Sequence, residues 1–244
     1  MNLYGNEIPN ILIKICEKEE YAKDVKNGKI YMKESGYFRK LEENHRGDIY
    51  DGKMPIHGNL DIKIGLKNGR IKSFKQDFPD LVIKEIDAGM VNDDKFPIYC
   101  TTILNENITE YISDKEFNFK NEFIEEMKNF GRYAVVFNAD ELIHKSSKYL
   151  VENKLATRGE TACILSTINY CDIHNKYTIK DTAYIQNLIQ FYNKDLSYKW
   201  QNECRLIILN NRLIPSDKDH FIMQIGELET AVIIPIDELN SLEL

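Results

Sequence analysis

The segment 198–209, YKWQNECRLIIL, constrains the fold more than any other part of the chain. It begins with polar and aromatic residues and ends in a continuous apolar run, which is typical of a strand that enters a core covered on both faces. Because side chains alternate along a strand, we expect Gln201, Glu203 and Arg205 to project from one face. These residues are candidates for a functional site. The alternative is a solvated strand face with a Glu203–Arg205 ion pair worth at most about 1 kcal/mol.

The composition favours one globular domain. The chain has 244 residues, 43% of them hydrophobic and 11% aromatic, so it can bury a substantial core, and we expect residues 1–244 to form a single domain. Its net charge of -7 argues against an extensive nucleic-acid-binding surface. The apolar run at 11–15 is interrupted by Lys14 and is too short for a signal peptide or a membrane span. We therefore expect a cytoplasmic protein without a membrane-bound part.

The cysteines agree with that compartment. Their number is odd and their spacing forms no framework, which predicts reduced thiols; they are Cys16, Cys100, Cys163, Cys171 and Cys204. Apolar neighbours indicate small buried side chains. Cys163, Cys171 and His174 include no CxxC pair, so we expect no metal site.

Hydrophobic periodicity predicts short strands and helices that follow one another along the whole chain. Strands are expected at 11–16, 29–33, 81–86, 96–104, 133–137, 161–173, 198–209, 220–225 and 230–235. Helices are expected at 19–27 before Gly28, after a capping box at 113–116, from Asp140 to Glu152, and at 181–194. The alternating runs around Asn68-Gly69 predict a hairpin within 59–75. This order indicates an α+β fold with mainly antiparallel sheets and flanking helices.

A helical stripe of large apolar side chains follows the proposed capping box. Phe119, Phe123, Met127 and Phe130 recur at helical spacing, and Gly131 comes directly after them. This pattern is typical of a helix face that packs on the core.

The segment 34–58, ESGYFRKLEENHRGDIYDGKMPIHG, has neither a helical nor a strand period. Its aromatic residues and arginines argue against disorder, so we expect an ordered loop that forms a wall of a ligand-binding site. Tyr37, Phe38 and Tyr50 would anchor this loop, and its glycine-rich end would be partly mobile.

Gln201-x-Glu203 resembles the Glu-x-Glu or Gln-x-Glu motif on the last essential strand of the mono-ADP-ribosyltransferases. The blocks YFRKLEENHRGDIYDG and YKWQNECRLII also resemble a widespread bacterial and phage family of unknown function, thought to be a distant relative of that fold. The resemblance implies an ADP-ribosyltransferase-like fold with NAD as cofactor. It also implies modification of a protein or nucleic-acid acceptor, in conflict between phages and their hosts.

The resemblance also implies site residues. Glu203 and Gln201 match the catalytic pair, and the cofactor-binding positions match Lys14, Ser35, Tyr37, Phe38, Arg39 and Arg46. This chain departs from the pattern in having Lys14 where many transferases have Arg or His. It also has Gln201 where the bacterial and phage family has an acid, and Ser35 in place of a Ser-Thr-Ser triplet.

The chemistry of NAD cleavage explains these residue types. Breaking the nicotinamide–ribose bond produces an oxocarbenium-like centre, as glycoside cleavage does. The carboxylate of Glu203 could stabilise that charge, and Gln201 could orient the acceptor. Lys14 or an arginine would neutralise the pyrophosphate, and an aromatic ring at 37 or 38 would stack on the nicotinamide.

Two other functions remain open from the sequence. One is a non-catalytic binding protein whose 34–58 loop recognises a partner. The other is a metal-dependent nuclease using Asp48, Asp51 and Glu203, although the strand has Arg205 where an E-x-K pattern needs lysine. The convergence of Lys14, Tyr37, Arg39 and Glu203 on one pocket would favour the transferase.

Overall fold

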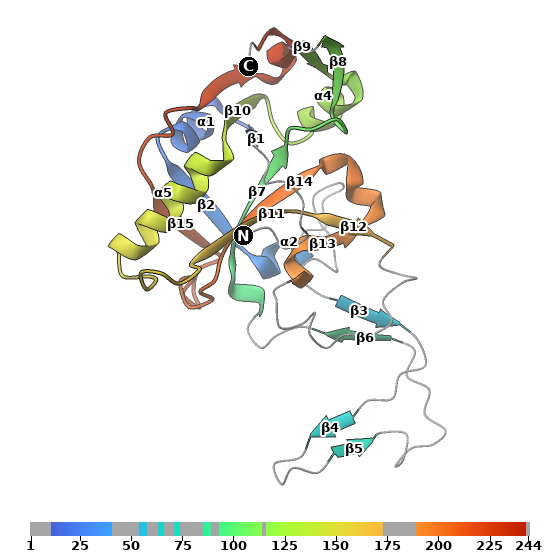
Figure 1. Cartoon of the computed structure of the whole chain (residues 1–244), viewed down its shortest axis with the longest axis vertical. Coiled ribbons are helices and arrows are strands. Elements are labelled where there is room, and N and C mark those ends of the chain that lie inside the picture. The colour runs from blue at the N-terminus through green and yellow to red at the C-terminus, as the bar shows by residue number, and fades with distance from the viewer. Residues whose placement is uncertain are drawn as a thin grey trace.

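Strand β7 (Pro97–Ile103) lies at the centre of the main sheet, between two sets of strands (Figure 1). The computed structural model describes residues 11–40, 54–57, 63–65, 71–73, 85–88, 93–113, 116–172 and 189–242. Strand β14 (Glu203–Ile208) runs antiparallel along one edge of β7, with Glu203 opposite Thr102. Strand β11 (Cys163–Thr167) pairs antiparallel with the other edge of β14. All residues of β14 are buried, and its apolar run predicts this for Leu206, Ile207 and Ile208. Glu203 and Arg205 are buried as well, so the alternative of a solvated strand face is wrong.

The other edge of β7 is shared by two strands, and here the sheet divides. Strand β1 (Ile11–Cys16) pairs antiparallel with the last two residues of β7, and strand β2 (Lys29–Glu34) with the first two. One branch continues from β1 to β10 (Tyr133–Asn138) and β16 (Val232–Pro235), the other from β2 to β15 (His220–Gln224). Within the described part of the chain, residues 99–101 of β7 have no strand partner on this edge.

Helices cover both faces of the sheet. They are α1 (Glu19–Lys26) and α5 (Ala139–Glu152) on one face, and α4 (Asn121–Lys128) with the 3-10 helix η4 (Ile236–Ser241) on the other. The consecutive residues Leu12 and Ile13 point to opposite faces, so Leu12 joins the cluster under α1 and α5 while Ile13 joins Phe123 and Met127 of α4. Phe123 and Met127 of the predicted stripe therefore pack on the core from α4, whereas Phe119 joins the same cluster from β9 (Glu116–Phe119) and Phe130 follows the end of α4. The prediction that one helix carries all four residues is wrong. The prediction of an α+β fold with a mainly antiparallel sheet and flanking helices is confirmed.

Two predicted helix starts are wrong. Asn138, and not Asp140, caps α5, because its side-chain oxygen accepts hydrogen bonds from the backbone N–H groups of Asp140 and Glu141 at 2.8 and 3.3 Å. The supposed capping box at 113–116 instead contributes to a hairpin. Ser113 ends β8 (Thr109–Ser113), Glu116 begins β9 (Glu116–Phe119), and α4 begins only at Asn121.

The segment 198–209 is not one strand. The 3-10 helix η3 (Leu196–Gln201) comes first, Asn202 is left-handed, and β14 begins at Glu203. The expected strand at 161–173 is divided into β11 and β12 (Asn169–Cys171). A predicted helix at 181–194 is wrong at its end, which contains the 3-10 helix η2 (Ile189–Tyr192) and strand β13 (Asn193–Asp195). Strand β13 pairs parallel with β12. Residues 181–188 lie outside the described ranges.

Part of the segment 34–58 is regular. Residues Ser35–Lys40 form helix α2, and β3 (Met54–His57) pairs antiparallel with β6 (Glu85–Ala88). Residues 41–53, including Tyr50, lie outside the described ranges. The predicted hairpin pairing is confirmed, because β4 (Lys63–Gly65) and β5 (Ile71–Ser73) pair antiparallel, while Asn68-Gly69 lies outside the described ranges. No helix in the described parts is long and apolar enough to cross a membrane.

Candidate functional site

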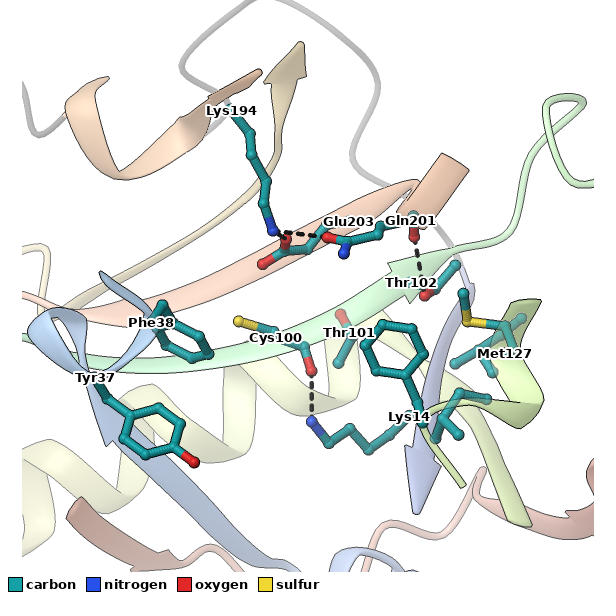
Figure 2. Close-up of a pocket in the computed structure, with 13 residues that line it drawn as sticks. Lys14, Tyr37, Phe38, Cys100, Thr101, Thr102, Met127, Lys194, Gln201 and Glu203 are labelled. Atoms are coloured by element: carbon teal, nitrogen blue, oxygen red, sulfur yellow. Dashed lines mark hydrogen bonds and ion pairs between the residues drawn. The ribbon is translucent and has the colours of Figure 1, made fainter. Parts of the chain in front are cut away.

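A pocket of about 290 Å³ lies where the sheet divides (Figure 2). Its floor comes from β1, β7 and β14, and its walls come from α2, the α4 region, β13 and η3. The residues that line it are Ile13, Lys14, Ile15, Tyr37, Phe38, Cys100, Thr101, Thr102, Met127, Phe130, Lys194, Gln201 and Glu203. Segments from the beginning, middle and end of the chain therefore build one site.

Glu203 is the centre of a buried ion-pair network. Its Oε1 accepts a hydrogen bond from Arg205 Nε at 2.6 Å, and its Oε2 accepts one from Lys194 Nζ at 3.0 Å. Lys194 Nζ also donates to Gln201 Oε1 at 2.7 Å. Lys194 therefore joins the amide and the carboxylate, and it comes from β13, a segment outside the motif.

The environment keeps Glu203 ionised. Burial by itself would raise the pKa of its carboxyl group, but the charges of Arg205 and Lys194 and hydrogen bonds from Arg205 and the Cys100 thiol outweigh burial. The pKa of Glu203 is therefore held well below its usual range. The pKa of Cys100 is raised, mainly by burial and secondly by the negative charge of Glu203, so this thiol stays protonated.

Tyr170 supports the first residue of β14 from β12. Its hydroxyl oxygen accepts a hydrogen bond from the backbone N–H of Glu203 at 2.8 Å. Burial and the nearby Glu203 charge raise the pKa of Tyr170, so its hydroxyl stays neutral at physiological pH.

Lys14 reaches the pocket through the gap in the sheet. Its Nζ donates a hydrogen bond to the carbonyl oxygen of Cys100 at 2.8 Å and lies 4.8 Å from the centre of the Tyr99 ring. Among the described residues that line the pocket, Lys14 and Lys194 accompany one carboxylate, that of Glu203, and the buried guanidinium of Arg205 pairs with Glu203 without itself lining the pocket. This part of the site is therefore net positive, although the whole chain is acidic, and it suits an anionic ligand.

Aromatic rings form two walls of the pocket. Tyr37 and Phe38 meet edge to face with their centroids 5.6 Å apart, and the Arg205 guanidinium lies 5.8 Å from the Phe38 ring centre. Phe130 lies against Trp200, with a centroid distance of 5.7 Å. Planar apolar surface near several cations can accept a ring that carries an anionic group.

The structure brings together most of the residues that the sequence indicated. Lys14, Tyr37, Phe38, Gln201 and Glu203 all line the pocket. Gln201 does so from the end of η3, so the prediction that it lies on the strand is wrong, although it still reaches the same lysine as Glu203.

Two predicted cofactor-binding residues, Ser35 and Arg39, are not part of this lining. Ser35 is fully buried, and its hydroxyl oxygen accepts a hydrogen bond from the backbone N–H of Phe96 at 3.3 Å, so it fastens the start of α2 to the strand region. Arg39 belongs to α2 but does not line the pocket. Arg46 lies outside the described ranges, as do Asp48 and Asp51 of the nuclease hypothesis.

Several lining residues were not identified as site residues from the sequence. Cys100, Thr101 and Thr102 lie on a strand that looked purely structural, and Met127 and Phe130 belong to the core stripe. Lys194 was not identified either, because the sequence pattern placed it at the end of a helix over 181–194. Only its place between a buried aromatic pair and the Gln201-x-Glu203 motif could have drawn attention to it.

No group of three or more His, Cys, Asp or Glu side chains in the described ranges could hold a metal ion. Comparison of the chain with protein-family models, curated proteins and solved structures finds no significant match.

Proposed function

We propose that this pocket binds NAD and that the protein is a mono-ADP-ribosyltransferase-like enzyme with a protein or nucleic-acid acceptor. The observation that carries the proposal is that Glu203 and Gln201 share one pocket with Lys14, Tyr37 and Phe38. These residues come from distant parts of the chain, and each has the chemistry that NAD cleavage requires.

The charge of the site supports a dinucleotide ligand. Lys14 and Lys194 both line the pocket, and their positive charges favour an anionic group such as a phosphate. A volume of about 290 Å³ is at the lower end of the range for ligand pockets, so it fits the nicotinamide–ribose part of NAD better than the whole molecule. Tyr37 and Phe38 offer apolar surface for the nicotinamide ring.

The ionised carboxylate of Glu203 supports the bond cleavage. Its oxygens accept hydrogen bonds from Arg205, Lys194 and the Cys100 thiol, and because a carboxylate has about four acceptor sites, one remains for a ribose hydroxyl. In the proposed reaction the ribose–nicotinamide bond breaks, its electron pair leaves with nicotinamide, and a nucleophilic atom of the acceptor bonds to the ribose carbon and releases its proton to water. Glu203 stabilises the positive charge that develops on the ribose.

A non-catalytic nucleotide-binding protein is the second candidate. It is favoured by the ion pairs at both oxygens of Glu203 and by the 6% exposure of this side chain. In this second candidate, the carboxylate of Glu203 keeps Lys194 and Arg205 in place and takes no part in a reaction.

The test is to incubate the purified protein with labelled NAD, with and without cell lysate, and to measure binding, nicotinamide release and transferred label. Glu203→Asp keeps a negative charge for both cations but withdraws it by one methylene, so we expect retained NAD binding and a rate lower by on the order of 100-fold. Glu203→Gln should lose on the order of 100- to 1,000-fold.

The matched control is Glu160→Gln, since Glu160 is exposed and outside this pocket. It should retain the wild-type rate, and circular dichroism checks that each variant is folded. NAD binding without cleavage would support the second candidate. A folded wild-type protein that neither binds nor consumes NAD overturns the proposal.

A further inference from the structure

Asn202 lies between the two residues of the Gln201-x-Glu203 motif and has an uncommon backbone conformation. Its φ and ψ are 45° and 47°, in the left-handed region. In the described ranges, Lys154 is the other non-glycine residue with positive φ. Side chains other than glycine disfavour this region, and asparagine is among the residues that tolerate it best.

The backbone turn at Asn202 changes the direction of the chain between η3 and β14. Its backbone N–H donates to the carbonyl of Lys199 at 3.2 Å, and its own carbonyl accepts from Ile103 N–H at 2.9 Å. One residue therefore closes the 3-10 helix and joins the next strand to the end of β7.

The side chain of Asn202 fixes the same turn from the other side. Its Nδ2 donates to the carbonyl of Ile103 at 2.6 Å and to Asn105 Oδ1 at 2.8 Å, and its Oδ1 accepts from Asn107 Nδ2 at 3.3 Å. Asn202 is 6% exposed, so these bonds are protected from water. Both amide groups of the residue, in the backbone and in the side chain, are engaged.

We infer that Asn202 is a positioning residue, which holds Gln201 and Glu203 so that both meet the ammonium group of Lys194. Asn202 does not line the pocket. It acts through its two chain neighbours, whose side chains lie 2.7 and 3.0 Å from Lys194 Nζ. The inference rests on the proposed function for its effect on rate, and on geometry alone for its effect on the side chain of Gln201.

The test variant is Asn202→Gly, because glycine adopts the left-handed conformation without strain but lacks the side-chain hydrogen bonds. The matched control is Lys154→Gly, at an exposed left-handed position away from this pocket. The first measurement is the side-chain amide signal of Gln201 in a ¹⁵N–¹H NMR spectrum, identified by its absence in Gln201→Ala. The second is kcat and KM for NAD.

In Asn202→Gly we expect a shifted or broadened Gln201 signal, kcat lower by on the order of 10- to 100-fold, and KM for NAD within about twofold of wild type. Lys154→Gly should change neither measurement. If Asn202→Gly does not fold, Asn105→Ala removes one side-chain partner and should shift the same signal.

A folded Asn202→Gly or Asn105→Ala protein with the wild-type Gln201 signal would overturn the inference. If the wild type has no activity with NAD, the proposed function fails, but the NMR measurement still decides whether Asn202 positions Gln201.

Discussion

The ammonium group of Lys14 donates a hydrogen bond to the backbone carbonyl of Cys100 at 2.8 Å, on the edge of β7 where residues 99–101 have no strand partner in the described ranges. A backbone carbonyl inside a sheet normally accepts from the neighbouring strand. Lys14 therefore supplies the hydrogen bond that a neighbouring strand would otherwise donate at the division of the sheet. Its ammonium group also contributes positive charge to the pocket.

Lys14→Met should remove both contributions. We expect the free energy of unfolding to fall by about 1–3 kcal/mol, because the buried carbonyl loses its donor, and the Kd for NAD to rise. Denaturant titration and calorimetry measure the two effects. Lys18→Met is the control, since Lys18 is exposed, and it should change neither quantity. An unchanged stability of Lys14→Met would contradict this role of the Lys14 hydrogen bond.

Lys194→Met and Glu203→Gln should differ in stability. Without Lys194, the ion pair of Glu203 and Arg205 remains and its two charges cancel. Without the charge of Glu203, two buried cations lose their counter-ion, which lowers the free energy of unfolding by about 3–5 kcal/mol. We expect the double variant to be more stable than Glu203→Gln alone. Chemical unfolding of the wild type and all three variants gives the coupling between the sites, and equal losses from the two single changes would contradict this account.

The contacts of Glu141 should make part of the free energy of unfolding depend on pH in the acid range. It accepts hydrogen bonds from the backbone N–H groups of Glu229 and Thr230 and pairs with Lys145 at 2.8 Å. Burial would raise the pKa of Glu141, but the Lys145 and Thr230 contacts and these N–H groups lower it to about 2 from 4.5. Because the folded-state pKa is the lower one, the stabilisation is present above about pH 4.5 and is lost as the pH falls towards 2.

Glu141→Gln should therefore be less stable than wild type by about 1–2 kcal/mol at pH 7, because solvent screens part of these contacts, and most of the difference should be lost near pH 2. Urea titrations between pH 2 and pH 7 measure it. Glu152→Gln, at an exposed position on the same helix, is the control and should follow the wild-type curve. A difference that persists unchanged at pH 2 would show that the charge of Glu141 is not responsible.

Gly28 and Gly226 form a matched pair for a steric prediction. Both have positive φ, 76° and 83°, but a Cβ at Gly28 would overlap the carbonyl of Gly226, while a Cβ at Gly226 would meet no atom within 4 Å. Gly226→Ala should cost about 1–2 kcal/mol of backbone strain. Gly28→Ala should cost clearly more, because the two backbones must separate. Thermal melts compare the variants, and equal Tm values would contradict this packing.

The inner strands could be predicted because their sequence pattern reflects burial directly. β10 is apolar up to its last residue, β7 is apolar except for Thr101 and Thr102, and both lie in the middle of the sheet. The junction at Asn202 could not be predicted in this way. Its left-handed turn depends on Ile103, Asn105 and Asn107, which lie about 100 residues earlier in the chain. The alternation between Gln201 and Glu203 therefore looked like an uninterrupted strand.

The Gln201-x-Glu203 motif and the resemblance based on it identified Glu203, Gln201 and Lys14 as site residues. Charged or amide side chains next to buried strands are easy to recognise in a sequence. The motif did not identify Lys194, whose position depends on the parallel pairing of β13 with β12. Ser35 was predicted to bind the cofactor but does not line the pocket. Its residue type fits a ligand contact, but its hydroxyl oxygen accepts a hydrogen bond from the backbone N–H of Phe96. A hydroxyl near a site acquires its role from tertiary contacts that composition does not encode.

The division of the sheet at β7 also has a kinetic consequence. Strand β7 gains its long partner β14 only when residues about 100 positions apart meet, and β10 meets β16 across a similar separation. Closing such loops costs chain entropy before the contacts form, so sheets of this kind fold slowly. The pocket shares its floor with the β7–β14 pairing and exists only after this pairing is complete. A ligand bound there therefore stabilises the fully assembled sheet against unfolding, and not one local segment of it.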